Sequence, residues 1–259
     1  MLLAEDDLLS REVACGMLAA LGLRVVLAHD GAEAVQRITE GGIDLVLMDV
    51  QMPVMDGLSA TRAIRAIPGV PRLPIVAMSA NTFPEDRRRC LEAGMDAHIP
   101  KPVDPGQLCN ELARWLPEDI RAASGLSVGG DGRAAPEGLI DVAAGLRCFG
   151  GREAAYHRML QRFAALRAGD AALVRAALVV GDHAQAGRLA HSLKSMAATL
   201  GAEALRSASA RVEVFATEGD GLALREALDA LDEALWAACA AMTAIAGPLP
   251  ANAHSRSDG

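Results

Sequence analysis

Lysine is almost absent from this chain of 259 residues. Of its 25 basic residues only Lys101 and Lys194 are lysines, and the others are arginines. They lie in the stretches HIPKPVD and AHSLKSM. Arginine presents a planar fork of donors and lysine a compact point charge, so the two are not interchangeable at a tight site. The two lysines are therefore the first candidates for functional positions.

An excess of positive charge is also lacking. The formal net charge is −8 at pH 7, and neither residues 1–117 nor the remainder is basic. Nucleic-acid binding normally leaves a basic patch or stripe in the sequence. We therefore expect no nucleic-acid partner, and we interpret the mild acidity as that of an ordinary soluble surface.

Paired cysteines and long apolar runs are missing as well. None of the five cysteines lies in a CxxC pair, which excludes the usual zinc spacing and favours reduced thiols in the cytoplasm. The start, MLLAEDD, has no basic segment before an apolar run and is not a signal peptide. The longest uncharged apolar run, 234–246, has 13 residues, fewer than the roughly 20 that span a membrane. We expect a cytoplasmic protein without membrane insertion.

Residues 1–117 alternate short apolar runs with amphipathic stretches. The runs LLA, RVVLA, DLVLM, PIVAM and HI are typical of buried parallel strands, and helical patterns of 10–15 residues separate them. This alternation predicts an α/β fold, a doubly wound five-stranded parallel sheet with helices on both faces. The chain begins inside the first predicted strand, so either this strand is short or the chain is part of something longer.

The composition changes after this region. Residues 118–138 are rich in Gly, Ala, Ser and Asp, which predicts a flexible linker able to span about 25 Å as a coil. Residues 139–246 have apolar residues three and four positions apart, which predicts an all-α helical bundle. We expect Trp236 to be a core anchor of this bundle. Residues 247–259 predict a disordered tail.

Polar side chains follow four of the predicted strands. Glu5 and Asp6 follow the first, Asp49 the third, Ser79 the fourth and Lys101 the fifth. Ligands of such sheets bind at the carboxyl ends of the strands, and clustered carboxylates are suited to Mg²⁺. Asp49 could then attack phosphorus to form an aspartyl phosphate, and the lysine could pair with Asp49 and the phosphoryl oxygens.

Two other interpretations of the acidic residues remain. Carboxylates after strands can simply cap the following helices, and for Asp7 this is as good an explanation as a ligand role. An aspartate after a strand also occurs in phosphatases of the haloacid dehalogenase type, but that class needs a second acid two residues later. Here that position is Gln51.

The first region resembles the receiver domain of two-component response regulators. LLAEDD, MDVQMPVMDG, VAMSAN and the lysine–proline pair of HIPKPV match that family in order and spacing. The family often has Tyr or Phe three positions before the lysine, where this chain has His98. The resemblance implies the following roles: Asp49 as phosphoacceptor, Asp6, Asp49 and the carbonyl of Gln51 as Mg²⁺ ligands, Glu5 acting through a water, and Ser79 and Lys101 as phosphoryl contacts.

In the helical region, His191 has an unusual environment for a lone histidine. Lys194 follows at i+3 on the same face, where a cation can hold a phosphoryl group and keep the imidazole neutral. Small residues surround this face, and an apolar stripe that includes Leu193 and Leu200 lies opposite. This pattern predicts that His191 lies on an accessible surface.

Residues 139–246 resemble a histidine phosphotransfer (Hpt) domain, because the stretch AHSLKSMAATLGA matches the signature of that family. The resemblance implies His191 as phosphoacceptor, Lys194 as its phosphoryl-binding helper and Gly201 as a packing or turn site. Together the two regions are similar to phosphorelay proteins and to the C-terminal part of hybrid histidine kinases. The expected partners are a sensor histidine kinase, a downstream response regulator, or both.

Rival interpretations concern the second region. In one, the bundle is an output that binds a partner while His191 is inert, and phosphorylation affects only the receiver. In another, the chain is itself a histidine kinase, but no stretch supplies a Gly-rich ATP lid or a nucleotide-binding helix with asparagine. We therefore expect a phosphotransfer protein without an ATP-dependent kinase domain.

Overall fold

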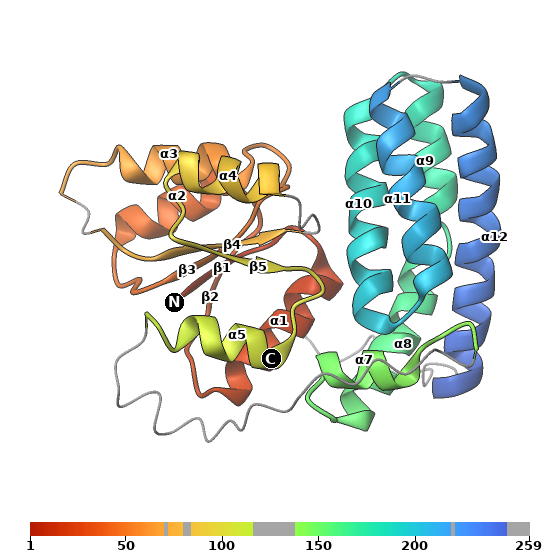
Figure 1. Ribbon diagram of the computed structural model, residues 1–259, viewed down its shortest axis with the longest axis horizontal. Coiled ribbons are helices and arrows are strands. Elements are labelled where there is room, and N and C mark those ends of the chain that lie inside the picture. Colours follow the sequence, from red (N-terminus) through yellow and green to blue (C-terminus); the bar gives the residue numbers. More distant parts are fainter. Residues whose placement is uncertain (70–71, 80–83, 116–137, 219–220, 248–259) are drawn as a thin grey trace, which may run out of the picture. The chain divides into compact units, whose positions relative to one another are not determined.

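The computed structural model describes residues 1–69, 72–79, 84–115, 138–218 and 221–247. Apart from Gly138 and Gly247, the predicted linker 118–138 and the predicted tail 247–259 lie outside these ranges. The chain divides into two compact units, Met1–Arg133 and Ala134–Gly259, the first built around a sheet and the second helical (Figure 1). No helix in the described ranges combines the length and apolar character that a membrane crossing requires.

The first unit contains a five-stranded parallel sheet with strand order β2-β1-β3-β4-β5. This confirms the predicted fold class. Because all strands run in parallel, their carboxyl ends share one edge of the sheet. The strands are β1 Leu2–Ala4, β2 Val26–Ala28, β3 Val46–Asp49, β4 Ile75–Ser79 and β5 Ala97–Pro100.

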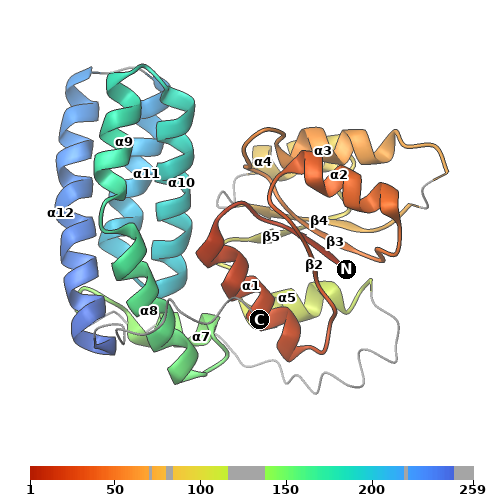
Figure 2. The same ribbon diagram turned by 180° about the vertical axis from the view of Figure 1, so that it is seen from behind.

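Helices cover both faces of this sheet (Figures 1 and 2). Helices α1 (Leu8–Ala20) and α5 (Pro105–Leu112) lie on one face, and α2 (Gly31–Glu40), α3 (Gly57–Arg65) and α4 (Pro84–Ala93) lie on the other. Successive strand residues point to opposite faces, and both faces are buried, so the strands are apolar throughout. Leu2 packs in the core beneath α2, α3 and α4, while its neighbour Leu3 is fully buried on the opposite side.

The second unit is a bundle of antiparallel helices (Figure 2). Helix α10 packs against α9 and α11, and α12 packs against α8, α9 and α11. The large side chains Tyr156 and Phe163 are fully buried in the bundle. The helices are α7 Val142–Cys148, α8 Glu153–Arg167, α9 Asp170–Val179, α10 His183–Leu200, α11 Glu203–Glu218 and α12 Gly221–Ala246.

Trp236 does not anchor this bundle. It is 76% exposed, so the prediction of a core role is wrong. The buried face of α12 contains Leu231, Leu235 and Met242, and Trp236 lies beside this stripe rather than in it. Apolar residues occupy both sides of this helix, so composition alone did not identify the buried side.

Aspartate starts many of the helices. In six described helices the N-cap is an aspartate whose carboxylate accepts a hydrogen bond from the backbone N–H three residues later, which satisfies an otherwise unpaired donor. Asp7 accepts from Ser10 at 2.8 Å, as the capping interpretation predicted. The six caps are Asp7, Asp30, Asp56, Asp104, Asp141 and Asp182.

Gly201 ends α10 in a position that a side chain would not fit. Its φ is 81°, in the left-handed region, and a Cβ here would lie 2.2 Å from the backbone oxygen of Asp141. Its own carbonyl accepts a hydrogen bond of 2.9 Å from the Asp141 N–H. The glycine thus fixes the approach of the segment before α7 to the end of α10.

We expect Gly201→Ala to be clearly more destabilising than Gly181→Ala. Gly181 has a similar φ of 78° but open space around its Cβ position, so alanine there meets only the left-handed penalty of about 1–2 kcal/mol. At Gly201 the overlap with a backbone carbonyl adds to that penalty. Urea unfolding of both variants, followed by circular dichroism, measures the difference, and equal losses would contradict the steric argument.

Candidate functional site

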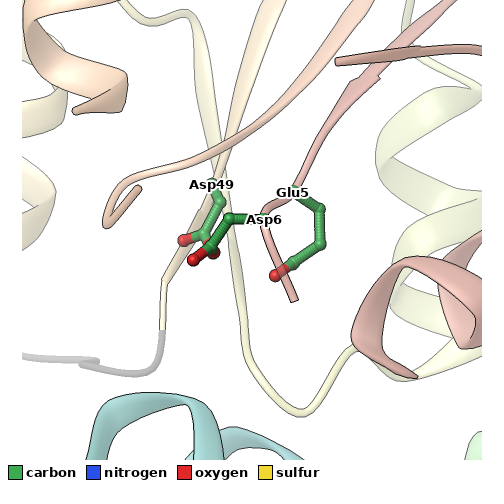
Figure 3. A group of neighbouring side chains, drawn as sticks. All are labelled: Glu5, Asp6 and Asp49. Atoms are coloured by element: carbon green, nitrogen blue, oxygen red, sulfur yellow. The ribbon is translucent and has the colours of Figure 1, made fainter. Parts of the chain in front are cut away.

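Three carboxylates gather at the carboxyl edge of the sheet. Glu5 and Asp6 follow β1, Asp49 ends β3, and one oxygen of each lies within 4.8 Å of the others. Figure 3 shows the three side chains extending to the same side of the strand ends. Glu5 and Asp49 are buried and Asp6 is exposed, so the cluster opens to solvent on one side. The structure thus brings together the acidic residues that the sequence singled out.

Lys101 joins this cluster from the end of β5. Its Nζ lies 2.6 Å from Oε2 of Glu5 and 2.7 Å from Oδ2 of Asp49. Its side chain is 7% exposed, so the two ion pairs form in a region of low dielectric. The backbone N–H of Lys101 also donates to the Ser79 carbonyl at 2.7 Å, and the following peptide bond to Pro102 is cis.

Burial and repulsion control the protonation of this cluster. Burial, with added repulsion from Asp49 and Asp6, raises the pKa of Glu5 to about 8, even though Lys101 acts in the opposite direction. Burial alone would lower the pKa of Lys101, but the carboxylates of Asp49 and Glu5 raise it well above its usual range. The lysine is therefore charged, and the cluster has more carboxylates than one ammonium group satisfies.

Gly57 leaves room for the backbone of Asp49. A Cβ on Gly57 would lie 2.1 Å from the backbone oxygen of Asp49, so the start of α3 passes too close for any side chain. The Gly57 N–H donates to the Val50 carbonyl at 3.0 Å, and the Gln51 N–H donates to Oδ1 of Asp49 at 3.1 Å. These contacts hold the loop that follows β3 against the carboxylate.

The donor set fits a hard divalent cation. Three carboxylates supply oxygen atoms at one point, and burial together with repulsion from Asp49 and Asp6 raises the pKa of Glu5. Oxygen ligands with an open, hydrated side are what Mg²⁺ prefers. Glu5, Asp6 and Asp49 are the residues that could hold it.

Ser79, the predicted hydroxyl contact, is the last residue of β4 and is buried. Its Oγ lies 2.8 Å from Nε2 of His98 on β5. The two strands pair with Ser79 opposite Pro100 and Ala77 opposite His98, so the ring reaches along the sheet toward its carboxyl edge. The sequence did not predict this hydrogen bond.

In the second unit, a carboxylate links the predicted histidine and lysine. Oε1 of Glu213, on α11, lies 2.8 Å from Nδ1 of His191, and its Oε2 forms a close ion pair with Nζ of Lys194. Burial pushes the pKa of Glu213 up, but His191 and Lys194 more than offset this effect and hold it below its usual range. Glu213 is therefore a carboxylate, which can only accept, so Nδ1 carries the proton and the lone pair of the neutral ring is on Nε2.

The prediction that His191 lies on an accessible surface is wrong in this structure. His191 is 6% exposed, and its Nε2 is buried and makes no hydrogen bond within the described residues. The predicted core stripe is correct in that Leu193 and Leu200 are fully buried. However, Glu213 reaches across from α11 and packs beside the ring, a contact between helices that a pattern within α10 does not reveal.

Glu213 is the site residue that sequence reasoning missed. It lies 22 residues after His191, without a motif around it. A possible signal was an acidic residue among the apolar positions of VEVFA, in the helix that follows the histidine helix. Such a residue can face a neighbouring helix, but only the register of α10 against α11 shows that it meets both His191 and Lys194.

Comparison with known proteins identifies one domain in each of the two units. Residues 1–113 match the response regulator receiver domain, and residues 158–241 match the Hpt domain. The sensor protein GacS of Pseudomonas syringae pv. syringae is 33% identical over 231 residues, which cover 85% of this chain and 24% of that protein. The sensor histidine kinase RcsC of Escherichia coli K12 is 39% identical over 102 residues, 39% of this chain and 10% of that protein.

Solved structures give similar matches to part of the chain. The receiver domain of the sensor histidine kinase PA1611 from Pseudomonas aeruginosa PAO1, with magnesium in its active-site cleft, is 44% identical. It covers 44% of this chain and 93% of that one, with a TM-score of 0.42. A complex of the phosphotransfer protein Ypd1 with the receiver domain of Ssk1 from Saccharomyces cerevisiae matches at 30% identity, 44% and 86% coverage and a TM-score of 0.41.

The chain spans about a quarter of the length of GacS and less of RcsC. The receiver match and the Hpt match do not overlap, and they follow one another in the order that the motifs predicted. This chain therefore carries a response regulator receiver domain, matched over residues 1–113, followed by an Hpt domain, matched over residues 158–241.

Proposed function

We propose that this protein passes phosphoryl groups through two acceptors, Asp49 in a receiver domain of residues 1–117 and His191 in an Hpt domain of residues 139–246. One observation carries the proposal: each acceptor has a buried lysine beside it, in a chain that has no others. Lys101 pairs directly with Asp49, and Lys194 shares the carboxylate of Glu213 with His191. A compact cation at each acceptor can balance the charge of a phosphoryl group.

The residues around Asp49 have separate roles in phosphoryl transfer. Glu5, Asp6 and Asp49, with the carbonyl of Gln51, would hold Mg²⁺, which when bound supplies positive charge to the phosphoryl oxygens. An Asp49 oxygen attacks phosphorus in line while the bond to the donor nitrogen breaks, and the donor imidazole keeps the electron pair. Lys101 and the hydroxyl of Ser79 contact the phosphoryl oxygens.

At His191 the reacting atom is Nε2. Its lone pair attacks the phosphorus of a receiver acyl phosphate, the bond from phosphorus to the carboxylate oxygen breaks, and the aspartate is regenerated. Glu213 keeps the Nδ1 proton in place and stabilises the positive charge that develops on the ring. Nε2 makes no hydrogen bond within the described residues, so its lone pair is not engaged by another group there.

The proposed partners are a sensor histidine kinase, which supplies phosphate, and a receiver aspartate, which exchanges it with His191. That aspartate is Asp49 of this chain or one on a separate response regulator. The main rival is a protein in which Asp49 is phosphorylated and the Hpt domain binds a partner while His191 stays inert. The shared Glu213 favours the relay, since an inert surface has no need for a carboxylate that orients His191.

The deciding experiment is transfer from a radiolabelled kinase–receiver donor mix, with Mg²⁺, to four versions of the protein. These are the unaltered chain, Asp49→Asn, His191→Gln and the double variant. Acid and base stability identify the linkage, because acyl phosphates are labile in base and phosphohistidine is labile in acid. We expect each single variant to carry only the linkage of its remaining acceptor, and the double variant to carry none.

Matched controls are available in both units. Asp44→Asn and His183→Gln change an exposed aspartate and an exposed histidine outside the two sites and should leave labelling intact. If label is lost with Asp49 alone and His191 carries none with competent donors, the inert-output rival is correct. If the unaltered protein takes no label on either residue, the proposed function is wrong.

A further inference from the structure

The hydrogen bond between His98 and Ser79 places a titratable ring behind a proposed phosphoryl contact. Its length of 2.8 Å, between Nε2 and Oγ, is that of an ordinary strong hydrogen bond. Ser79 is buried, and His98 is partly buried on the neighbouring strand. The sheet pairing of β4 and β5 fixes the distance between the two backbones, so the contact does not depend on a mobile loop.

Proton counting limits how this contact can work. A serine hydroxyl has one proton to donate and two lone pairs that accept. If Ser79 donates its proton to a phosphoryl oxygen on Asp49, it cannot also donate to His98. The hydrogen bond to His98 then persists only if Nε2 carries a proton and donates it to Oγ.

We propose that His98 is a positioning residue for phosphoryl transfer at Asp49: its Nε2–H donates to Ser79 Oγ and turns the hydroxyl proton toward the phosphoryl group. This inference rests on the proposed function, in which Ser79 contacts that group. The opposite tautomer, with the proton on Nδ1, would draw the hydroxyl proton to Nε2 and away from the reacting atoms. The side chain at position 98 therefore favours one orientation of the Ser79 hydroxyl proton over the other.

The surroundings of His98 set the pH range in which this matters. Burial lowers the pKa of His98 below its usual 6.5 and Arg87 lowers it further, while Asp86 raises it, both charged residues lying on α4. At neutral pH the ring is thus uncharged and both tautomers are available. As the pH falls through the lowered pKa, both nitrogens become protonated, so every molecule has the Nε2–H that the proposal requires.

Two substitutions separate this role from simple packing. His98→Phe keeps a ring but has no donor, and we expect it to slow labelling of Asp49 about three- to tenfold, the value of one hydrogen bond. His98→Gln keeps an N–H donor that does not titrate, and we expect labelling within about twofold of the unaltered rate. Below pH 6.5 the labelling rate of the unaltered protein should rise relative to the labelling rates of both variants.

The test measures labelling of Asp49 in the His191→Gln background between pH 5 and 8, with the same donor and Mg²⁺ for all variants. Adding Ser79→Ala should remove the effect of His98→Phe on the labelling rate, because the ring acts only through the hydroxyl. Nitrogen-15 NMR of His98, with Mg²⁺ and beryllium trifluoride as the phosphoryl analogue, should show a proton on Nε2.

The outcomes distinguish the two proposals. If Asp49 takes label but His98→Phe matches the unaltered protein in rate and pH profile, the role of His98 is refuted and the proposed function stands. An unprotonated Nε2 in the beryllium trifluoride complex refutes it as well. If Asp49 takes no label in the unaltered protein, the proposed function fails at that site and the inference fails with it.

Discussion

Replacement of Lys101 by methionine is expected to lower the free energy of unfolding of the receiver domain by about 3–5 kcal/mol above pH 8 without Mg²⁺. Lys101 is the counter-ion of two buried carboxylates, at 2.6 Å from Glu5 and 2.7 Å from Asp49. Removal of one partner from a buried ion pair leaves charge without compensation, which costs about that amount. Methionine is similar in length and apolar, so the loss reports charge rather than a cavity.

Below pH 8 the loss should become smaller. The pKa of Glu5 is about 8 with Lys101 beside it and rises further without the lysine, so a proton can take the place of the missing ammonium as the pH falls. Mg²⁺ should also restore part of the stability, because it is a cation placed among the same carboxylates. Urea unfolding at pH 6 and 8.5, in EDTA and in Mg²⁺, measures both effects.

The matched control is Arg88→Met, which removes an exposed cation from a surface pair with Glu92. Surface pairs of this kind contribute about 0–1 kcal/mol, so the control should be close to neutral. A Lys101→Met protein as stable as Arg88→Met in EDTA at pH 8.5 would show that Glu5 and Asp49 do not depend on the lysine.

Replacement of Glu213 by alanine is expected to slow phosphoryl exchange at His191 about 10- to 100-fold, by analogy with the cost of removing a carboxylate that orients a metal-binding histidine. Glu213 accepts the Nδ1 hydrogen bond of His191 and pairs with Lys194. Without it, neutral His191 can place its proton on either nitrogen, and the fraction with a lone pair on Nε2 falls. Glu213→Gln retains an accepting oxygen, so a smaller loss is expected.

The measurement is transfer to His191 from a labelled receiver in the Asp49→Asn background, which removes the second acceptor. Glu203→Gln, on the same helix and paired with the exposed Arg206, serves as the control. Nitrogen-15 NMR of His191 should show a proton mainly on Nδ1 in the unaltered protein and a mixture in Glu213→Ala. If the alanine variant transfers at the unaltered rate, Glu213 has no orienting role.

Local pattern predicted most of the elements of this protein. The apolar runs of residues 1–117 became the five strands, and even the two letters HI marked β5, since a strand buried on both faces leaves a short apolar run. Asp30 and Asp182 stand directly before amphipathic stretches, and in the structure each caps the helix that follows. Glu5, Asp49 and Lys101 were expected to meet because parallel strands bring their carboxyl ends together, and the structure places the three side chains in contact.

Contacts between elements distant in sequence were the harder part. The partner of Ser79 is His98, which the sequence showed only as an unusual residue near Lys101. The partner of His191 comes from a different helix, where one glutamate looks like any other. Both contacts depend on the register of neighbouring elements, which hydrophobic periodicity within one element does not determine.

The aspartates at the N-caps of six helices account for part of the excess of acidic residues in this protein. Its net charge is −8, and six of its acidic side chains accept hydrogen bonds from backbone N–H groups of their own helices. Serine or asparagine could cap these helices without charge. Part of the acid excess is thus a by-product of how the helices begin, although each capping carboxylate still adds its full negative charge to the surface potential.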